Sequence, residues 1–361
     1  MQPTHTRSEK RHAKHHARND STLGFDDTGM MTSRVLPEEQ EVRQNLPVNM
    51  RAIVYRDYGG PEVLELAETK TPFPDPKKVI IRVEAAGVNP IDYRLRAGQA
   101  RYVLPGGFPR IPGYDVAGTI VFAPGESGFY PGDRVMAFLD NKYGGGYAEY
   151  ARCRSNSVAK IPEDMSIEHA AAIPLAATTA LQSLRDHGKL KAKDRVLING
   201  ASGGVGAFAV QIAKAYGALV TGVASGANES FVMSLGADEF IDYEKVDFTR
   251  AGQAWDLIFD AAGKSGYLKA RNVMTQKGRF VSTEPNLSGA IMTILTKFSS
   301  KGGVIMLATP SRDDLRELVQ LYTDEKLTVT IDHLFPLAQA SDAHKRIEKG
   351  VDRGKIVLTT K

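Results

Sequence analysis

Residues 195–217 read RVLINGASGGVGAFAVQIAKAYG and carry the strongest structural signal in the chain. Val196, Leu197 and Ile198 form a short branched apolar run that is typical of a buried strand. The largely apolar segment 207–215 is predicted to be a helix, and residues 217–223 a second strand. Together they predict a strand–helix–strand unit of about 30 residues.

A glycine turn joins the first strand to the helix. It matches the GxGxxG pattern, with alanine in place of the first glycine. Gly203 would let a pyrophosphate come close, and Gly206 would let the helix pack against the strand. The free N–H groups at the helix start suit phosphate oxygens. We therefore predict dinucleotide binding, against the alternative of a purely structural turn, by Ala201, Ser202, Gly203, Gly204, Val205 and Gly206.

The end of the second predicted strand bears on the choice of cofactor. An NAD site usually places Asp or Glu about 20 residues after the glycines, where the carboxylate binds the ribose 2′-hydroxyl. Here the chain has Ser225 and Asn228, with no acid before Glu229. Both side chains can donate hydrogen bonds to a 2′-phosphate, so the pattern favours NADPH, although no Lys or Arg lies in this loop. The alternative is that both residues only form the turn.

Composition limits the classes of function. With 361 residues, 42% hydrophobic and 24% charged, the chain has the length and balance of a two-domain globular protein. No run of about 18 apolar residues is present, so we expect no membrane span. The single Cys153 argues for a reduced thiol and a cytoplasmic location. The net charge of +4 is too small to argue for nucleic acid.

Residues 1–49 differ from the rest. They hold four of the eight histidines together with a basic cluster, and they lack apolar periodicity. We predict a disordered extension. From residue 50 to 173 short strands are broken by Gly and Pro, as in a mostly β domain, and the segment 166–184 is predicted to be helical. Beyond it strands and helices alternate, which predicts a doubly wound parallel sheet.

The sequence pattern alone does not assign the end of the chain to either domain. Residues 313–322 are predicted to be a helix and residues 355–358 a strand, and either could belong to either domain.

A set of motifs in fixed order carries a resemblance over the whole chain after residue 49. The chain resembles the medium-chain dehydrogenase/reductase superfamily, in particular its zinc-independent quinone oxidoreductase branch. Within that branch it is most similar to the chloroplast-envelope quinone oxidoreductase-like enone reductases. The motifs are MRAIVYRDYGGPEVLEL, EAAGVNPIDYRLRAG, FPRIPGYDVAGTIV, PGDRVMAF, GGGYAEYA, AAIPLAATTALQSL, INGASGGVGAFAVQIAKAYGA, SLGADEFIDY and GKIVL.

The resemblance implies an α/β architecture of two domains. A GroES-like, mostly β catalytic domain would comprise residues 50–173 and 310–361, around a Rossmann cofactor domain of residues 174–309. It also implies a homodimer formed through the edge strand of the Rossmann sheet, for which residues 304–307 are apolar enough. Residues 282–303 are expected to help shape the substrate pocket.

Two departures from the zinc-dependent relatives concern metal binding. Where those relatives have Cys and His, this chain has Asn89 and Tyr114, and the four-cysteine structural loop is absent. Asp115 matches the family's acidic residue near the metal, and we expect a structural role for it here. Zinc needs three or four Cys, His or carboxylate ligands, so we predict no metal site.

The chemistry that the resemblance implies is hydride transfer from NADPH to a quinone or an α,β-unsaturated carbonyl compound. Asn89 and Asp92 would line the cleft beside the nicotinamide; the alternative is that they only tie the turn together. Tyr102 lies where related enoyl reductases have a tyrosine proton donor, but Tyr93 or Tyr143 would fit the pattern equally well.

Two further residues match family positions near the cofactor. The hydroxyl of Thr179 would lie near the nicotinamide, and Tyr243 would close over the adenosine phosphate. Ordinary reasons exist for both, since threonine suits a helix start and an aromatic residue suits a strand edge.

Two rival interpretations remain at this stage. One is a reductase or dehydrogenase that serves a single biosynthetic pathway. The other is a non-catalytic NADPH-binding sensor or adaptor that uses the basic tail to bind a polyanion or a protein.

Overall fold

The computed structural model describes residues 24–25, 31–32, 46–284 and 301–360. The chain divides into two compact units, Met1–Glu41 and Val42–Lys361. In the first unit the short strands β1 (Gly24–Phe25) and β2 (Met31–Thr32) pair antiparallel. The predicted disorder of residues 1–49 concerns mainly residues outside the described ranges and stays a prediction.

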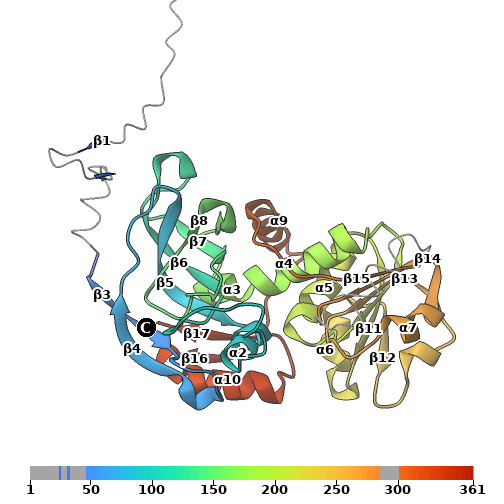
Figure 1. Ribbon diagram of the computed structural model, residues 1–361. Helices are drawn as coiled ribbons and strands as arrows, with labels where there is room; N and C mark the ends of the chain where they lie inside the picture. The colour runs from blue at the N-terminus through green and yellow to red at the C-terminus, as the bar shows by residue number, and fades with distance from the viewer. Residues whose placement is uncertain (1–23, 26–30, 33–45, 285–300, 361) are drawn as a thin grey trace, which may run out of the picture. The chain divides into compact units, whose positions relative to one another are not determined.

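The second unit contains a six-stranded sheet whose described strands are all parallel (Figure 1). Its strand order is β12-β11-β10-β13-β14-β15, so the order reverses on either side of β10. The predicted doubly wound parallel sheet is thereby confirmed, and such sheets bind ligands beyond the carboxyl ends of their strands at this reversal. The strands are β10 (Arg195–Asn199), β11 (Leu219–Ala224), β12 (Glu239–Asp242), β13 (Trp255–Asp260), β14 (Met274–Ser282) and β15 (Gly302–Ile305).

Helix α5 (Gly204–Ala215) follows β10 through the glycine turn. It begins three residues before the predicted start at residue 207, because two glycines of the turn already adopt helical geometry. Its side chains, with Val210 and Ile212 fully buried, pack against Val196 and Ile198 of β10 in the main apolar core. The shorter helices of this region are α6 (Glu229–Ser234) and α7 (Tyr267–Ala270).

A second sheet has seven strands in mixed orientation, ordered β16-β17-β5-β6-β7-β9, with β8 beside β5. Here β17 pairs antiparallel with β5, so the end of the chain returns to this sheet. The hairpin of β3 (Asn49–Val54) and β4 (Glu65–Lys70) is separate. The strands of the second sheet are β5 (Lys78–Val88), β6 (Asp115–Phe122), β7 (Arg134–Phe138), β8 (Tyr150–Arg154), β9 (Val158–Lys160), β16 (Ile331–Pro336) and β17 (Lys355–Thr359).

The predicted helical segment 166–184 is divided. Helix α3 (Ile167–Ala172) ends before Pro174, which opens α4 (Pro174–Gln182), and a single π turn, Ser183–His187, follows. Proline has no N–H to continue a helix, and it suits a first helical position. Two other helices connect strands of the seven-stranded sheet. Helix α2 (Pro90–Arg96) follows β5, and α10 (Ala340–Lys349) lies between β16 and β17.

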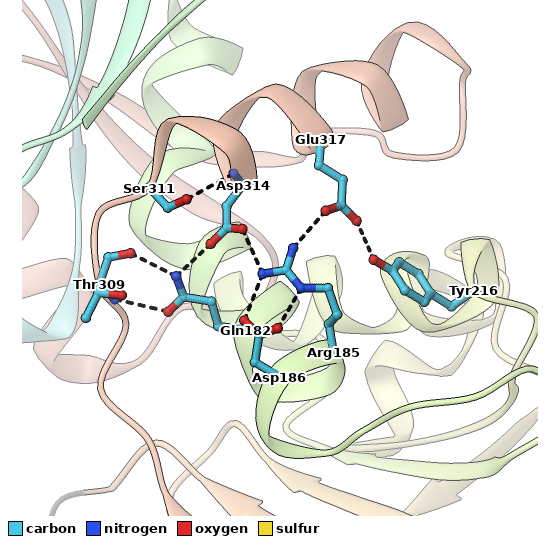
Figure 2. Close-up of polar contacts among 8 residues, drawn as sticks. All are labelled: Gln182, Arg185, Asp186, Tyr216, Thr309, Ser311, Asp314 and Glu317. Atoms are coloured by element: carbon cyan, nitrogen blue, oxygen red, sulfur yellow. Dashed lines mark hydrogen bonds and ion pairs between the residues drawn. The ribbon is translucent and has the colours of Figure 1, made fainter. Parts of the chain in front are cut away.

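Polar contacts tie helix α9 (Arg312–Thr323) to the end of α4, to the π turn that follows it and to the end of α5 (Figure 2). The Gln182 side chain donates to Asp314 Oδ2 at 2.7 Å, and Arg185 forms ion pairs with Asp314 at 2.7 Å and Glu317 at 2.8 Å. Tyr216, beyond α5, donates to Glu317 as well. These contacts fix α9 against the helices of the six-stranded sheet. Within the described ranges, no helix has both the length and the apolar character that a membrane span needs.

Candidate active site

A cavity of about 1170 Å³ opens at the carboxyl ends of β10, β11, β13 and β14. This exceeds the 300–1,000 Å³ that is typical of small-molecule sites. Its wall contains the glycine turn, Ser202 to Gly206, and the loop at the end of β11. The other sheet contributes residues 88–90 and 354–356. The glycine turn and residues of the predicted catalytic domain therefore line the same cavity.

The glycine turn is sterically constrained. A Cβ on Gly206 would overlap the carbonyl oxygen of Gly200 and lie 2.7 Å from its carbonyl carbon. At Gly203 the nearest atom to such a Cβ would be 3.6 Å away, so that glycine leaves open space on the cavity side. Ala201 is fully buried in the core rather than on the cavity wall. Gly354 donates its N–H to the Ser202 carbonyl at 3.1 Å, so the chain's last strand starts directly beside the turn.

Ser225, Asn228 and Tyr243 line the cavity beyond β11. Their role at the adenosine end stays a prediction. The Asn228 amide donates to Ser225 Oγ at 3.1 Å. Arg353 approaches the same loop: its Nε donates to Asn228 Oδ1 at 2.8 Å and its Nη2 to the Ala227 carbonyl at 3.0 Å. Sequence reasoning missed this cation because it lies 125 residues along the chain from Asn228.

Asn89 and Lys355 also line the cavity. The Asn89 amide nitrogen donates to Asp115 Oδ2 at 2.8 Å, and the Lys355 ammonium donates to Asn89 Oδ1 and, at 3.0 Å, to the Val88 carbonyl. Asp115 also accepts the backbone N–H of Leu175 at 2.7 Å, which caps α4. The expected structural role of Asp115 thus has a geometric basis.

Asp92 lies behind this wall rather than on it. Its Oδ2 accepts the backbone N–H of Asn89 at 2.8 Å and the hydroxyl of Tyr147 at 3.0 Å, while its Oδ1 is buried with no partner among the described residues. Burial raises the pKa of Asp92 to about 7, although the hydrogen bond from Asn89 opposes the shift. Burial also raises the pKa of Asp115 to about 6, against the pull of Lys355.

The raised pKa of Asp92 gives a pH-dependent prediction for Asp92→Asn. Between the ordinary aspartate pKa of 3.8, which applies in the unfolded chain, and the folded pKa of about 7, the unfolded chain loses this proton while the folded chain keeps it. Rising pH therefore destabilises the unsubstituted protein relative to Asp92→Asn, by up to about 1.4 kcal/mol per pH unit in that window. Urea unfolding of both proteins from about pH 5 to about pH 8 measures this; a difference that does not change with pH contradicts the assignment.

Comparisons with known proteins agree with this geometry. The family model of the alcohol dehydrogenase GroES-like domain matches residues 75–163, and that of the zinc-binding dehydrogenases matches residues 235–358. A chloroplastic quinone-oxidoreductase homolog of Spinacia oleracea is 35% identical over 323 residues, covering 86% of this chain and 98% of the relative. The chain belongs to the medium-chain dehydrogenase/reductase superfamily, in its quinone oxidoreductase branch.

Two further members of this superfamily are similar over most of their length. The 2-methylene-furan-3-one reductase of Solanum lycopersicum is 31% identical over 340 residues, covering 91% of this chain and 83% of the relative. The solved structure of the quinone oxidoreductase from Coxiella burnetii matches with a TM-score of 0.81 at 31% identity, covering 87% of this chain and 100% of that chain. The protein is therefore an oxidoreductase of a family that binds nicotinamide cofactors.

The three candidate proton donors and Thr179 lie off the described part of the cavity wall; those candidates are Tyr93, Tyr102 and Tyr143. Tyr102 is 83% exposed, and its hydroxyl accepts a hydrogen bond from Arg101 at 2.8 Å. The hydroxyl of Tyr143 donates to a backbone carbonyl at 2.6 Å, and Thr179 is buried with its hydroxyl donating to the Leu175 carbonyl at 2.7 Å. In the structure Asn89 lines the same cavity as the glycine turn. Tyr102 and Thr179 do not line it.

Zinc does not fit the position that it occupies in zinc-dependent members of the superfamily. Asn89 and Tyr114 replace the thiolate and imidazole ligands there, and the Tyr114 hydroxyl donates to the Lys142 carbonyl at 2.9 Å. The Asn89 oxygen already accepts from an ammonium group, whose charge would repel a cation. No group of three or more His, Cys, Asp or Glu suited to a metal occurs among the residues that the structure describes.

Proposed function

We propose that this oxidoreductase reduces quinones or α,β-unsaturated carbonyl compounds with NADPH, by direct hydride transfer without a metal. The observation that carries the proposal is a single cavity with three regions in sequence. Ser225, Asn228, the glycine turn and Asn89 all line it. The consecutive residues 353, 354 and 355 contact Asn228, Ser202 and Asn89 in turn, which supports an order with the glycine turn between the other two regions. An extended dinucleotide fits this order, with its phosphates at the start of α5.

The adenosine end supports NADPH over NADH. A 2′-phosphate would lie among the Ser225 hydroxyl, the Asn228 amide and the Arg353 guanidinium, and charged donors of this kind bind phosphate well. Strand β12, which pairs with β11, ends at Asp242. The Asp242 carboxylate forms an ion pair with Lys245 at 3.0 Å. Its charge is therefore partly compensated, and repulsion against a phosphate is weak.

Arg353→Ala tests this cofactor assignment. The variant loses the cation beside Asn228, so we expect the KM for NADPH to rise roughly tenfold, with little change for NADH. Arg56→Ala is the matched control, because Arg56 is an exposed arginine that pairs with Glu65 away from the cavity. Equal effects of Arg353→Ala on both cofactors would contradict a role in 2′-phosphate recognition.

At the reacting end the bound cofactor supplies a hydride to the substrate. The wall there is apolar around Pro90 and Ala176, which suits the ring or alkene of the substrate. Asn89 offers an amide N–H to the carbonyl or quinone oxygen that gains negative charge. That oxygen can take its proton from water, so the proposal needs no acid at Tyr102.

The names of the relatives support both substrate classes. The spinach and Coxiella proteins are named for quinones, whereas the tomato protein is named for 2-methylene-furan-3-one, a carbonyl-conjugated alkene. Both classes present a planar acceptor with an oxygen that becomes anionic. The same N–H donor at Asn89 would serve either.

Consumption of NADPH with a panel of naphthoquinones and short and long enones tests the function, with NADH in parallel and EDTA as a metal control. We expect consumption with at least one class, faster with NADPH, and unaffected by EDTA. Tight NADPH binding without consumption for any acceptor would favour the sensor or adaptor instead.

We also propose a homodimer through β15, the edge strand of the six-stranded sheet among the described strands. Leu307, which is 73% exposed, extends this edge with apolar surface. Light scattering tests it, and a monomer at micromolar concentration would exclude it.

A further inference from the structure

Lys355 is a buried charged residue on the cavity wall. Its side chain is 5% exposed, and burying an ammonium group is unfavourable unless it is paired. Its partners are the Val88 carbonyl at 3.0 Å, Asn89 Oδ1, and Asp115 Oδ2 at 3.9 Å. Two of these three partners are consecutive in the chain, with Val88 at the end of β5 and Asn89 directly before α2.

The partners of Asn89 determine how its amide is oriented. Lysine can only donate, so it must face the amide oxygen. An ionised carboxylate can only accept, so Asp115 must face the amide nitrogen. The oxygen and nitrogen of Asn89 are therefore assigned by their neighbours on both sides.

This orientation leaves one N–H available. The Asn89 nitrogen has two N–H groups, and one of them goes to Asp115 at 2.8 Å. No other acceptor for it is present in the described part of the chain, and Asn89 lies on the cavity wall. Because Lys355 binds the amide oxygen, it withdraws electron density and makes the remaining N–H a stronger donor.

We infer that Lys355 is a positioning residue, which fixes and polarises the Asn89 amide so that its second N–H is a donor for the substrate oxygen. The inference rests on the proposed function. Lys355 then acts through Asn89 and not by contact with the substrate. Asp115 completes the arrangement, since its carboxylate compensates the buried ammonium and holds the other N–H. Burial lowers the pKa of Lys355, and the charge of Asp115 opposes that shift.

A double-mutant cycle tests the inference, with Lys355→Met, Asn89→Ala and the combined variant. Lys355→Met keeps the length of the side chain but removes its charge and its donors. We expect kcat to fall roughly tenfold to a hundredfold, as is common when the support of a catalytic group is lost. The Kd for NADPH, measured by fluorescence, should change by less than about threefold. In the Asn89→Ala background Lys355→Met should cost almost nothing further.

Three results would overturn the inference. The first is an equal loss of kcat from Lys355→Met with and without Asn89, which would make its role independent of the amide. The second is a large rise in the Kd for NADPH with unchanged kcat, which would assign Lys355 to the cofactor phosphates next to Gly204. The third is unchanged kcat and unchanged Kd.

Lys355→Gln guards against a folding defect in Lys355→Met. It keeps a neutral donor for Asn89 Oδ1 and is expected to retain more kcat than Lys355→Met, with an unchanged thermal midpoint. The inference predicts an intermediate kcat for folded Lys355→Gln, because the variant keeps the donor but loses the charge. A kcat equal to that of the unsubstituted protein would overturn the polarising role, and a loss as large as that of Lys355→Met would overturn the positioning role of the donor. Failure of the proposed function is distinct, because then the unsubstituted protein itself would not consume NADPH.

Discussion

Gly206→Ala is expected to abolish cofactor binding and to destabilise the fold by about 3 kcal/mol or more. The added Cβ would overlap the Gly200 carbonyl oxygen and lie 2.9 Å from the Cα of Ala201, and all of these are backbone atoms. These backbone atoms cannot move away unless α5 separates from β10, and both elements contribute side chains to the main core. Urea unfolding and NADPH fluorescence titration measure the two effects.

Two alanine variants serve as controls for this steric argument. Gly203→Ala has space for its Cβ and ordinary backbone geometry, so the fold should keep its stability while the new methyl hinders the pyrophosphate. At Gly125 a Cβ meets nothing within 4 Å, so Gly125→Ala should change neither quantity. If Gly206→Ala behaved like Gly125→Ala, the close packing of the turn would be refuted.

Asn89→Ala is expected to lower kcat by about 10² to 10³, with the Kd for NADPH nearly unchanged. This is the usual cost of removing one hydrogen-bond donor to an oxygen that gains charge in the transition state. The readout is steady-state kinetics with the best acceptor, together with fluorescence titration of NADPH.

Ile91→Ala is the matched control for Asn89→Ala, because Ile91 lies two residues further on in the first turn of α2, is 36% exposed and does not line the cavity. Its kcat should stay within about threefold of the unsubstituted protein. If kcat fell no further in Asn89→Ala than in Ile91→Ala, Asn89 would have no role in catalysis and would only form the turn. Such a result would also remove the basis for the role inferred for Lys355.

The parts of the fold that follow from local pattern could be predicted. The branched run Val196 to Ile198, the glycine turn and the alternation beyond it each specify short-range geometry, and the parallel sheet follows from them. The break at Pro174 is local as well, and it could have been read from the missing N–H. Ser225, Asn228 and Tyr243 line the cavity because strand ends of a parallel sheet meet at one edge.

The residues that sequence reasoning missed act across long separations. Arg353 and Lys355 come from the far end of the chain, and they reach the site only because β17 pairs with β5 and begins beside the glycine turn. The GKIVL motif supported the resemblance, but nothing local in it indicates which way the lysine points. The match at Tyr102 is local and lies in a loop, and loop side chains are set by tertiary contacts that a motif does not encode.

Transfer of deuterium from NADPH labelled at C4 of the nicotinamide tests the central claim most directly. The acceptor would be the best substrate of the panel in ordinary water, with mass spectrometry of the product and with rates compared for labelled and unlabelled cofactor. Direct hydride transfer predicts slower oxidation of the labelled cofactor and, for an enone, one deuterium at the β-carbon of the product. Equal rates together with a product free of deuterium would contradict the account.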